Sequence, residues 1–588
     1  MLLSLHRLGG WCIERLQGLV FLAWTMARSF YVRTFGCQMN EHDSEQLEAL
    51  LSADGLVRAP DLQSADVVVL NTCCIRENAD NRFYGHLGHL KSLSEAKPGM
   101  QIAVGGCLAQ REGEALLERA GHIDVVFGTH NLERLPQLLK KAALSGPVVE
   151  VLDARDRVLE PEGLPGHDPA VNELAAAASH DALGALAARR VPYAAWITIQ
   201  RGCDNSCAFC TVPQVRGPEV SRPFDVLVAE ARALAGQGVT EVTLLGQNVN
   251  SYGRDITRRR PLFADLLRAI GAVEGIRRVR FTSPHPKDLR PETIAAMAET
   301  DAVCEHLHLP LQSGSNRVLG AMHRGYTAQR YLEKVAAARD AIPDLALTTD
   351  IIVGFPSETE SDFEDTLAVV AEAGYDSAYT FVFSPRPGTA AASMTGSFVP
   401  DEVVADRFAR LVEVVDRSGI SRHRARIGQI EEVLVEGPSK RNADVWTGRT
   451  RQGKLVHFSP SFASGPARGP GGQPARGPGG QPGGQPAGGP GSQSNVWPSP
   501  ATSGDLGLHR GLRPGSYATV QVTDAAPHHL VGYLRELVAL PADAGGEVRR
   551  PGSEPGGRAR PVGVAPEPSG SPEGSVAVGR RLIPVRVG

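Results

Sequence analysis

The sequence lacks three features that would classify it at once: a strong excess of one charge, an apolar run that could cross a bilayer, and a disulfide pattern. The formal net charge is only −4 over 588 residues, so any RNA contact must come from a local basic patch rather than from bulk charge. The apolar stretch LQGLVFLAW near the start is too short to span a membrane, and no convincing cleavage site follows it. We therefore expect no membrane segment.

Cysteines are few and unevenly placed. The chain has nine, an odd number, and three of them stand close together as Cys203, Cys207 and Cys210. This distribution argues against a disulfide framework and favours metal ligation in a reducing compartment. We therefore expect a cytoplasmic protein.

The length exceeds what one hydrophobic core supports, which predicts about three domains plus low-complexity material. Residues 1–28 are expected to form an N-terminal extension, and Met26 leaves open that the assigned start is wrong and translation begins later. Residues 153–190 are polar and rich in proline, alanine and aspartate, a composition that indicates a linker.

Residues 29–152 alternate apolar, strand-like runs with helix-like stretches, which predicts an open α/β sheet. Cys37, Cys73 and Cys107 each come at or just after the end of a predicted strand. Because the carboxyl ends of parallel strands converge on one crevice, these three distant residues are expected to become neighbours.

Residues 191–426 show a second alternation with six strand-like runs, from AWITIQRGC to AYTFVFS. This pattern predicts a partial (β/α)6 barrel, with its chemistry on the loops that follow the strands. The cysteine triplet follows the first of these strands, as that geometry requires.

The remaining chain turns strand-like and predicts a small β-barrel over residues 427–535. A Gly/Pro-rich insert at 464–505, in which ARGPGGQP occurs twice in tandem, interrupts it. Such a composition cannot bury a core, so we expect the insert and the tail at 536–588 to be disordered.

The triplet Cys203, Cys207 and Cys210 has the spacing CxxxCxxC, which suits three corners of a 4Fe-4S cluster, whereas complete ferredoxin-type ligation needs four cysteines. The open iron can chelate S-adenosylmethionine (SAM), and electron transfer then splits its sulfonium to give a 5'-deoxyadenosyl radical. A zinc site or an electron carrier is the alternative, but no second cysteine pair lies nearby to complete a zinc site. Phe209, directly before the last cysteine, fits the radical SAM form CxxxCxFC.

Polar residues and glycines follow the later barrel strands, where they could line a SAM pocket. For any single one of these residues, turn capping remains an equally good explanation. The candidates are Gly246, Gln247, Asn248, Ser283, His285, Gln312, Ser313, Gly354 and Glu358.

Four motifs together carry a family resemblance: TFGCQMNEHDSE (34–45), NTCCIRENA (71–79), VGGCLAQ (104–110) and IQRGCDNSCAFCTVPQVRGPEVSRP (199–223). With a C-terminal TRAM-like barrel, the chain over roughly 30–535 resembles the MiaB-type radical SAM methylthiotransferases. Sibling groups that act on threonylcarbamoyl-adenosine or on a ribosomal-protein aspartate are less similar at the first motif. The resemblance implies an enzyme that adds sulfur and a methyl group at carbon 2 of N(6)-isopentenyladenosine beside the anticodon of tRNA, with two SAM molecules per product.

The resemblance also implies a second, auxiliary 4Fe-4S cluster on Cys37, Cys73 and Cys107. Cys74 is an alternative ligand, although adjacent strand residues point opposite ways. Implied partners are the tRNA, a low-potential electron donor such as flavodoxin or ferredoxin, and proteins that supply sulfur and iron-sulfur clusters. We expect a monomer.

The predicted C-terminal barrel carries basic residues close to Trp446 and Phe458, a mixture that suits phosphate contacts and base stacking on RNA. A solvated polar face is the alternative, and the resemblance to TRAM favours RNA binding. The candidate RNA contacts are Lys440, Arg441, Arg449, Arg451 and Lys454.

Overall fold

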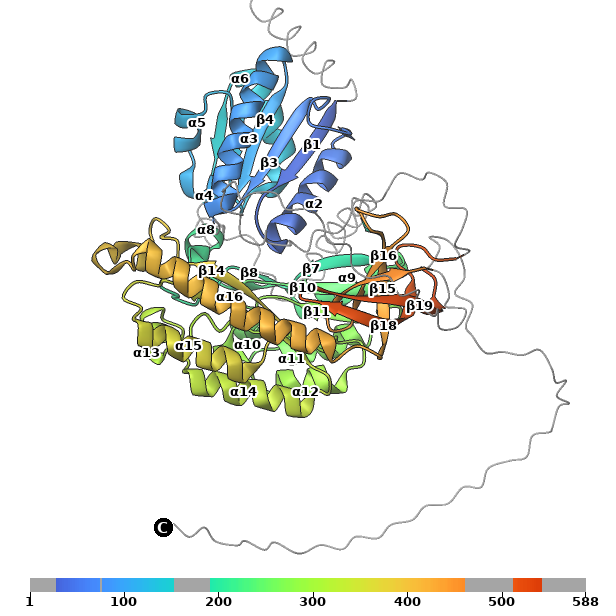
Figure 1. Ribbon diagram of the computed structural model, residues 1–588. Coiled ribbons are helices and arrows are strands. Elements are labelled where there is room, and N and C mark those ends of the chain that lie inside the picture. The colour runs from blue at the N-terminus through green and yellow to red at the C-terminus, as the bar shows by residue number, and fades with distance from the viewer. Residues whose placement is uncertain (1–27, 75–76, 153–190, 461–510, 542–588) are drawn as a thin grey trace, which may run out of the picture. The chain divides into compact units, whose positions relative to one another are not determined.

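The computed structural model describes residues 28–74, 77–152, 191–460 and 511–541 (Figure 1). The predicted linker and insert, and nearly all of the predicted extension and tail, lie outside these ranges. Within these ranges, no helix has both the length and the apolar character needed to cross a membrane.

The N-terminal domain is built on a six-stranded parallel sheet with the strand order β2-β1-β3-β4-β5-β6. The central strands are buried on both faces, which is why their sequences are continuous apolar runs rather than alternating ones. The open α/β prediction is confirmed. The strands are β1 (Ser29–Thr34), β2 (Val57–Arg58), β3 (Val67–Thr72), β4 (Gln101–Gly106), β5 (Val125–Phe127) and β6 (Val148–Glu150).

Helices cover both faces of this sheet. Helices α2 (Gln38–Ala53) and α6 (Leu135–Ser145) pack on the face that carries Val67 and Val69. The opposite face, with Val68 and Leu70, is covered by α3 (Glu77–Ala96), α4 (Cys107–Glu112) and α5 (Ala115–Arg119). The two resulting cores hold the strand ends, and therefore the cysteines that follow them, in place.

The second domain contains six parallel strands in two three-stranded sheets, β11-β10-β7 and β12-β13-β14, joined by a bridge between Val279 and Val303. Helices cover the outer face of these strands and form the largest apolar core of the described chain. The partial (β/α)6 barrel is confirmed. Its strands are β7 (Ala194–Thr198), β10 (Glu241–Leu245), β11 (Arg278–Phe281), β12 (His306–His308), β13 (Ala346–Val353) and β14 (Ser377–Val382), and its longer helices are α9 (Phe224–Gly236), α11 (Phe263–Gly271), α12 (Pro291–Glu299), α14 (Ala328–Ala341), α15 (Glu360–Ala373) and α16 (Asp401–Arg424).

The last domain is a closed barrel with the strand order β15-β16-β17-β19-β18, which confirms the predicted small β-barrel. Strand β19 extends to Ala539 because Leu537 packs against the barrel core. Residues 536–539 therefore belong to the barrel, which corrects the predicted tail boundary. The strands are β15 (Ile430–Pro438), β16 (Trp446–Thr450), β17 (Leu455–Ser459), β18 (Tyr517–Ala526) and β19 (His529–Ala539).

Candidate active site

The CxxxCxxC triplet lies on the loop that follows β8 (Gln200–Arg201). The loop is fixed by backbone hydrogen bonds, among them Cys203 N to Gly217 O at 3.2 Å and Cys210 N to Cys207 O at 3.1 Å. Gly202 has φ +75°, and a Cβ there would lie 1.9 Å from the carbonyl oxygen of Pro218. Only glycine allows this close approach, so the start of the loop is determined by its sequence.

Hydrogen-bond donors surround the thiols of the triplet. The buried Arg324 guanidinium lies 3.3 Å from Cys207 Sγ, and the backbone and side-chain nitrogens of Asn205 lie 3.5 Å from Cys203 Sγ. Burial raises the pKa of Cys203 and raises that of Cys210 to about 12, so a thiolate here needs a positive partner. Arg324 supplies one. It lies on the distant connection between the short helix α13 (Asn316–Ala321) and α14, and no sequence signal links it to the triplet.

The other three predicted cluster cysteines follow three adjacent strands, β1, β3 and β4. Cys37 Sγ and Cys107 Sγ lie 3.9 and 4.0 Å from Oδ1 of Asn40. Cys73 packs against Gly36, where a Cβ would lie 2.7 Å from Cys73 Sγ and where φ is +120°. The structure thus brings these residues to the same edge of the sheet.

Cys74 also belongs to this group. Its thiol lies 3.3 Å from Thr211 Oγ1, and it is buried together with Cys107 and Val215. The Cys74 thiol, followed by the Arg216 guanidinium, lowers the pKa of Cys107, whereas Cys107 and burial raise the pKa of Cys74. The two adjacent cysteines therefore face different neighbours, Cys73 towards Gly36 and Cys74 towards Cys107.

Asn40 and Arg216 connect these thiols to the barrel. The Asn40 amide donates to the carbonyl oxygens of Phe35 (2.9 Å) and Thr72 (2.7 Å), which aims its oxygen at the thiols. Arg216, from α8 (Val212–Arg216) just after the triplet, donates to that oxygen at 3.1 Å. Its charge therefore lies beside the thiols of the N-terminal domain.

The two sets of three cysteines are candidate ligands of iron-sulfur clusters. All eight cysteines within the described ranges are free thiols. Three thiols spread over a loop or along a sheet edge suit a larger cluster, whose irons are separate corners. Cys203, Cys207 and Cys210 could hold one such cluster, and Cys37, Cys73 and Cys107 another.

Several predicted SAM residues carry buried polar atoms that have no hydrogen-bond partner. The atoms are both side-chain polar atoms of Gln247, Oδ1 of Asn248, Nε2 of His285 and Oε1 of Gln312. Native structures rarely leave such atoms unpaired unless a ligand or water meets them. A polar ligand such as SAM therefore fits this position.

A short relay connects the same residues to the triplet. The His285 ring packs edge-on against Tyr326, at 5.8 Å between centroids. The Tyr326 hydroxyl donates to Leu311 O at 2.8 Å, beside Gln312, and accepts from Arg324 at 3.2 Å. Gln312 and Ser283 have positive φ values of 67° and 59°, a strain that clusters at functional sites.

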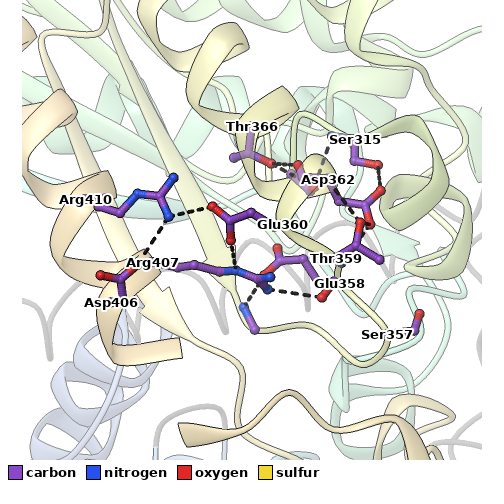
Figure 2. Close-up of polar contacts among 12 residues, drawn as sticks. Ser315, Ser357, Glu358, Thr359, Glu360, Asp362, Thr366, Asp406, Arg407 and Arg410 are labelled. Atoms are coloured by element: carbon purple, nitrogen blue, oxygen red, sulfur yellow. Dashed lines mark hydrogen bonds and ion pairs between the residues drawn. The ribbon is translucent and has the colours of Figure 1, made fainter. Parts of the chain in front are cut away.

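The remaining SAM candidates make contacts within the protein. Glu358 accepts from Gly354 N at 2.9 Å and from Arg407 at 3.1 Å (Figure 2). Ser313 Oγ meets Thr366 Oγ1 at 3.3 Å. The structure therefore gives Glu358 and Gly354 a capping contact within one turn, whereas Ser313 contacts α15. At Gly246 a Cβ would lie 2.9 Å from the Gln200 side chain, so close packing explains this glycine.

The predicted RNA contacts separate into two groups, three residues that form ion pairs within the protein and two that are exposed. Arg451 forms an ion pair with Glu305, and Lys454 forms one with Asp376; the two acidic residues belong to the radical SAM barrel. Arg449 forms an ion pair with Glu436 inside the C-terminal barrel. Trp446 and Phe458 are buried in the barrel core and cannot stack on bases. Lys440 and Arg441 alone among the five are exposed, on the turn between β15 and β16.

Comparison with known proteins agrees with this arrangement. Residues 29–128 match the family described as "Uncharacterized protein family UPF0004", and residues 197–370 match the "Radical SAM superfamily". A Nocardia farcinica protein named tRNA-2-methylthio-N(6)-dimethylallyladenosine synthase is 46% identical over 517 residues, covering 86% of this chain and 89% of that protein. A Mycobacterium marinum protein, named as synthase 1 of the same activity, is 44% identical over 557 residues and covers 92% of each chain.

Proposed function

Because the chain belongs to the radical SAM methylthiotransferase family, we propose that it adds a methylthio group to carbon 2 of N(6)-isopentenyladenosine next to the anticodon of tRNA. The observation that carries the proposal is that the chain has two sets of three thiols. One set lies on each side of a contact between the N-terminal domain and the barrel. Cys37 packs with Met39 against Trp196 and Leu245 at the inner side of the barrel strands. We therefore infer that both thiol sets face the same opening of the barrel.

The substrate chemistry requires cofactors. Carbon 2 of adenine carries an unactivated C–H bond, which acid–base side chains cannot break, so a cofactor must supply the reactive species. When bound, a cluster on Cys203, Cys207 and Cys210 would supply the electron that releases a 5'-deoxyadenosyl radical from SAM. A second cluster on Cys37, Cys73 and Cys107 would hold the sulfur that is methylated. Two SAM molecules per product follow.

The chain's own residues position and neutralise these groups. Arg324 places a buried charge on the Cys207 thiol, and Arg216 places one beside Cys37 and Cys107. The unpaired polar atoms of Gln247, Asn248, His285 and Gln312 would orient the amino-acid and adenosine parts of SAM.

RNA contacts are proposed for Lys440 and Arg441. Both are exposed on one turn, and flexible cations of this kind bind phosphates without reading sequence. We further propose that the enzyme acts in the cytoplasm as a monomer, receives electrons from a flavodoxin or ferredoxin, and is resupplied by sulfur and cluster donors. The free thiols support a reducing compartment.

The test is anaerobic reconstitution of the full chain with iron, sulfide, SAM and a reductant. The substrate is tRNA from a strain that lacks the corresponding gene, and the product is measured by nucleoside mass spectrometry. We expect 2-methylthio-N(6)-isopentenyladenosine and 5'-deoxyadenosine. A methylthio mark on a ribosomal protein with unaltered tRNA would indicate a protein-modifying enzyme, and an absence of 5'-deoxyadenosine would indicate a nonenzymatic sensor.

A further inference from the structure

The inner face of the second half-barrel carries polar and aromatic side chains that neither the cluster loops nor the SAM residues use. Strand register places His308 beside Thr348, and Asp350 beside Tyr379, on the adjacent strands β12, β13 and β14. Because side chains alternate along a strand, all four project from one face.

The opposite face of the same strands shows that this face is the inner one. Leu347, Thr349 and Ile351 alternate with Thr348 and Asp350, and all three are fully buried, the two apolar ones in the core beneath the outer helices. The inner side chains are instead partly open: His308 is 19% exposed, Asp350 28% and Tyr379 39%. A polar face that stays accessible inside a barrel is not packed as a core, so its side chains are available to a ligand.

The polar groups are already oriented with respect to one another. His308 Nδ1 lies 3.1 Å from Thr348 Oγ1, and its Nε2 lies 3.5 Å from a carboxylate oxygen of Asp350. If the Thr348 hydroxyl donates to Nδ1, then Nε2 carries the ring proton. The pair then presents a donor and an acceptor side by side.

The surface adjoins the SAM residues. The backbone of Gln312, whose side chain has an unpaired oxygen, pairs with β13 through Gln312 N to Asp350 O (2.8 Å) and Ile352 N to Gln312 O (2.9 Å). A molecule bound on Asp350 and His308 would therefore lie next to the position expected for SAM.

We propose that Asp350, His308 and Tyr379 bind the base of the substrate, an inference that rests on the proposed tRNA function. Asp350 accepts the single N–H at N6 of isopentenyladenosine, and His308 donates to the ring nitrogen beside it. Tyr379 provides the aromatic face on which the base stacks. A base in a single-stranded loop can be turned out and read in this way, by its edge and by stacking.

The experiment measures kcat/KM for methylthiolation of an anticodon stem-loop that carries isopentenyladenosine, using the reconstituted full chain. Asp350→Leu removes the acceptor at similar size, and we expect a loss of about 10- to 100-fold, the usual discrimination of a base-edge contact. Asp350→Asn keeps an acceptor oxygen and is expected to retain much of the activity. Asp340→Leu, on the exposed side of α14, is the matched control and should resemble the wild type.

A modified substrate separates a binding role from a structural one. A stem-loop whose N6 also carries a methyl group has no N–H, so the wild type should lose activity on it to a similar extent. For Asp350→Leu, kcat/KM on the methylated stem-loop should be close to its kcat/KM on the natural stem-loop, because the variant already lacks the acceptor for the N–H. SAM cleavage without RNA, which reports an intact barrel and cluster, should be unchanged in the variant.

Tyr379 provides a second, independent readout. Tyr379→Phe keeps the ring and should leave KM near the wild-type value, whereas Tyr379→Ala should raise KM by about 10-fold, within the range for loss of one base stack. If the wild type is active and Asp350→Leu is equally active, the inference on base binding is overturned while the proposed function stands. Absence of any methylthiolated product from the wild type would overturn the proposed function, and the inference with it.

Discussion

Arg216 and Asp43, 173 residues apart in the chain, form an ion pair of 2.7 Å in which both side chains are almost completely buried. Asp43 lies on α2, the first long helix of the N-terminal domain, and Arg216 ends α8, the short helix that directly follows the triplet loop. Burial of two charges is costly unless they remain paired. The contact therefore ties the loop of one thiol set to the helix that borders the other.

Removal of this cation should destabilise the contact. Arg216→Met leaves the Asp43 carboxylate buried without a partner, and we expect a loss of about 3–5 kcal/mol. The free energy of unfolding is measured by chemical denaturation, with retention of bound iron as the signal. Arg417→Met is the control, because Arg417 pairs with Glu413 on the exposed face of α16 and such pairs contribute about 0.5 kcal/mol or less. An Arg216→Met variant as stable as the control would contradict a structural role for the pair.

Substitution of a cysteine should have different effects on the products in the two thiol sets. Alanine at Cys203, Cys207 or Cys210 should abolish 5'-deoxyadenosine formation, since each substitution removes a proposed ligand of the radical-generating cluster. Cys37→Ala should preserve 5'-deoxyadenosine and stop sulfur insertion. Chromatography of both products from one reaction checks this. Cys304→Ala removes a buried thiol outside both sets and should retain both products; equal loss of 5'-deoxyadenosine in Cys37→Ala would refute the division of roles.

Acid should loosen the packing of α16 against the C-terminal barrel through His423. Burial lowers the pKa of His423 from 6.5 to about 4, and its Nδ1 lies 3.0 Å from the carbonyl oxygen of Ala526 on β18. The unfolded chain takes up a proton as pH falls below 6.5 while the folded chain resists it, so stability falls through the window from 6.5 to 4. The expected loss is about 2 kcal/mol.

Hydrogen–deuterium exchange of α16 and β18 at about pH 7 and about pH 5, on either side of the ordinary histidine pKa, measures this effect. His423→Gln cannot titrate and should show a smaller decrease in protection between the two pH values than the wild type. His528→Gln changes an exposed histidine on the same barrel and should behave like the wild type. Identical pH dependence in wild type and His423→Gln would rule the histidine out as the cause.

RNA affinity should depend on Lys440 and Arg441. The double alanine variant should bind tRNA more weakly and reduce the slope of log affinity against log salt by about 1–2, since each missing cation leaves one phosphate with its counterion. Fluorescence anisotropy over a salt series gives this slope. Arg451→Ala removes a cation that bonds Glu305, so it should reduce stability without changing the slope.

The arrangement of the cysteines was predictable because it follows from topology. Cys37, Cys73 and Cys107 come after strands that must be parallel, and parallel strands end at one edge. Arg324 and Arg216 were not predictable, because their partners lie far away in sequence and no spacing rule connects a lone arginine to a thiol. The sequence offers Cys74 only as a substitute ligand, whereas the structure pairs it with Cys107.

The predicted RNA surface shows what a local charge pattern leaves out. A run of basic residues near aromatic ones indicates RNA binding only if the cations are free and the rings exposed. Arg451 and Lys454 instead meet Glu305 and Asp376, acidic residues of another domain that a local charge pattern does not reveal. Trp446 and Phe458 occupy the inward positions of their strands, which follows from strand alternation once the barrel closes.

The C-terminal barrel closes through parallel pairing of β17 with β19 and antiparallel pairing of β18 with β15 and β19, so the five described strands complete its ladder. The entropy lost on closing a flexible connection grows only with the logarithm of its length, about 0.6 kcal/mol for each doubling. Added or deleted copies of the ARGPGGQP unit would therefore change the free energy of folding very little.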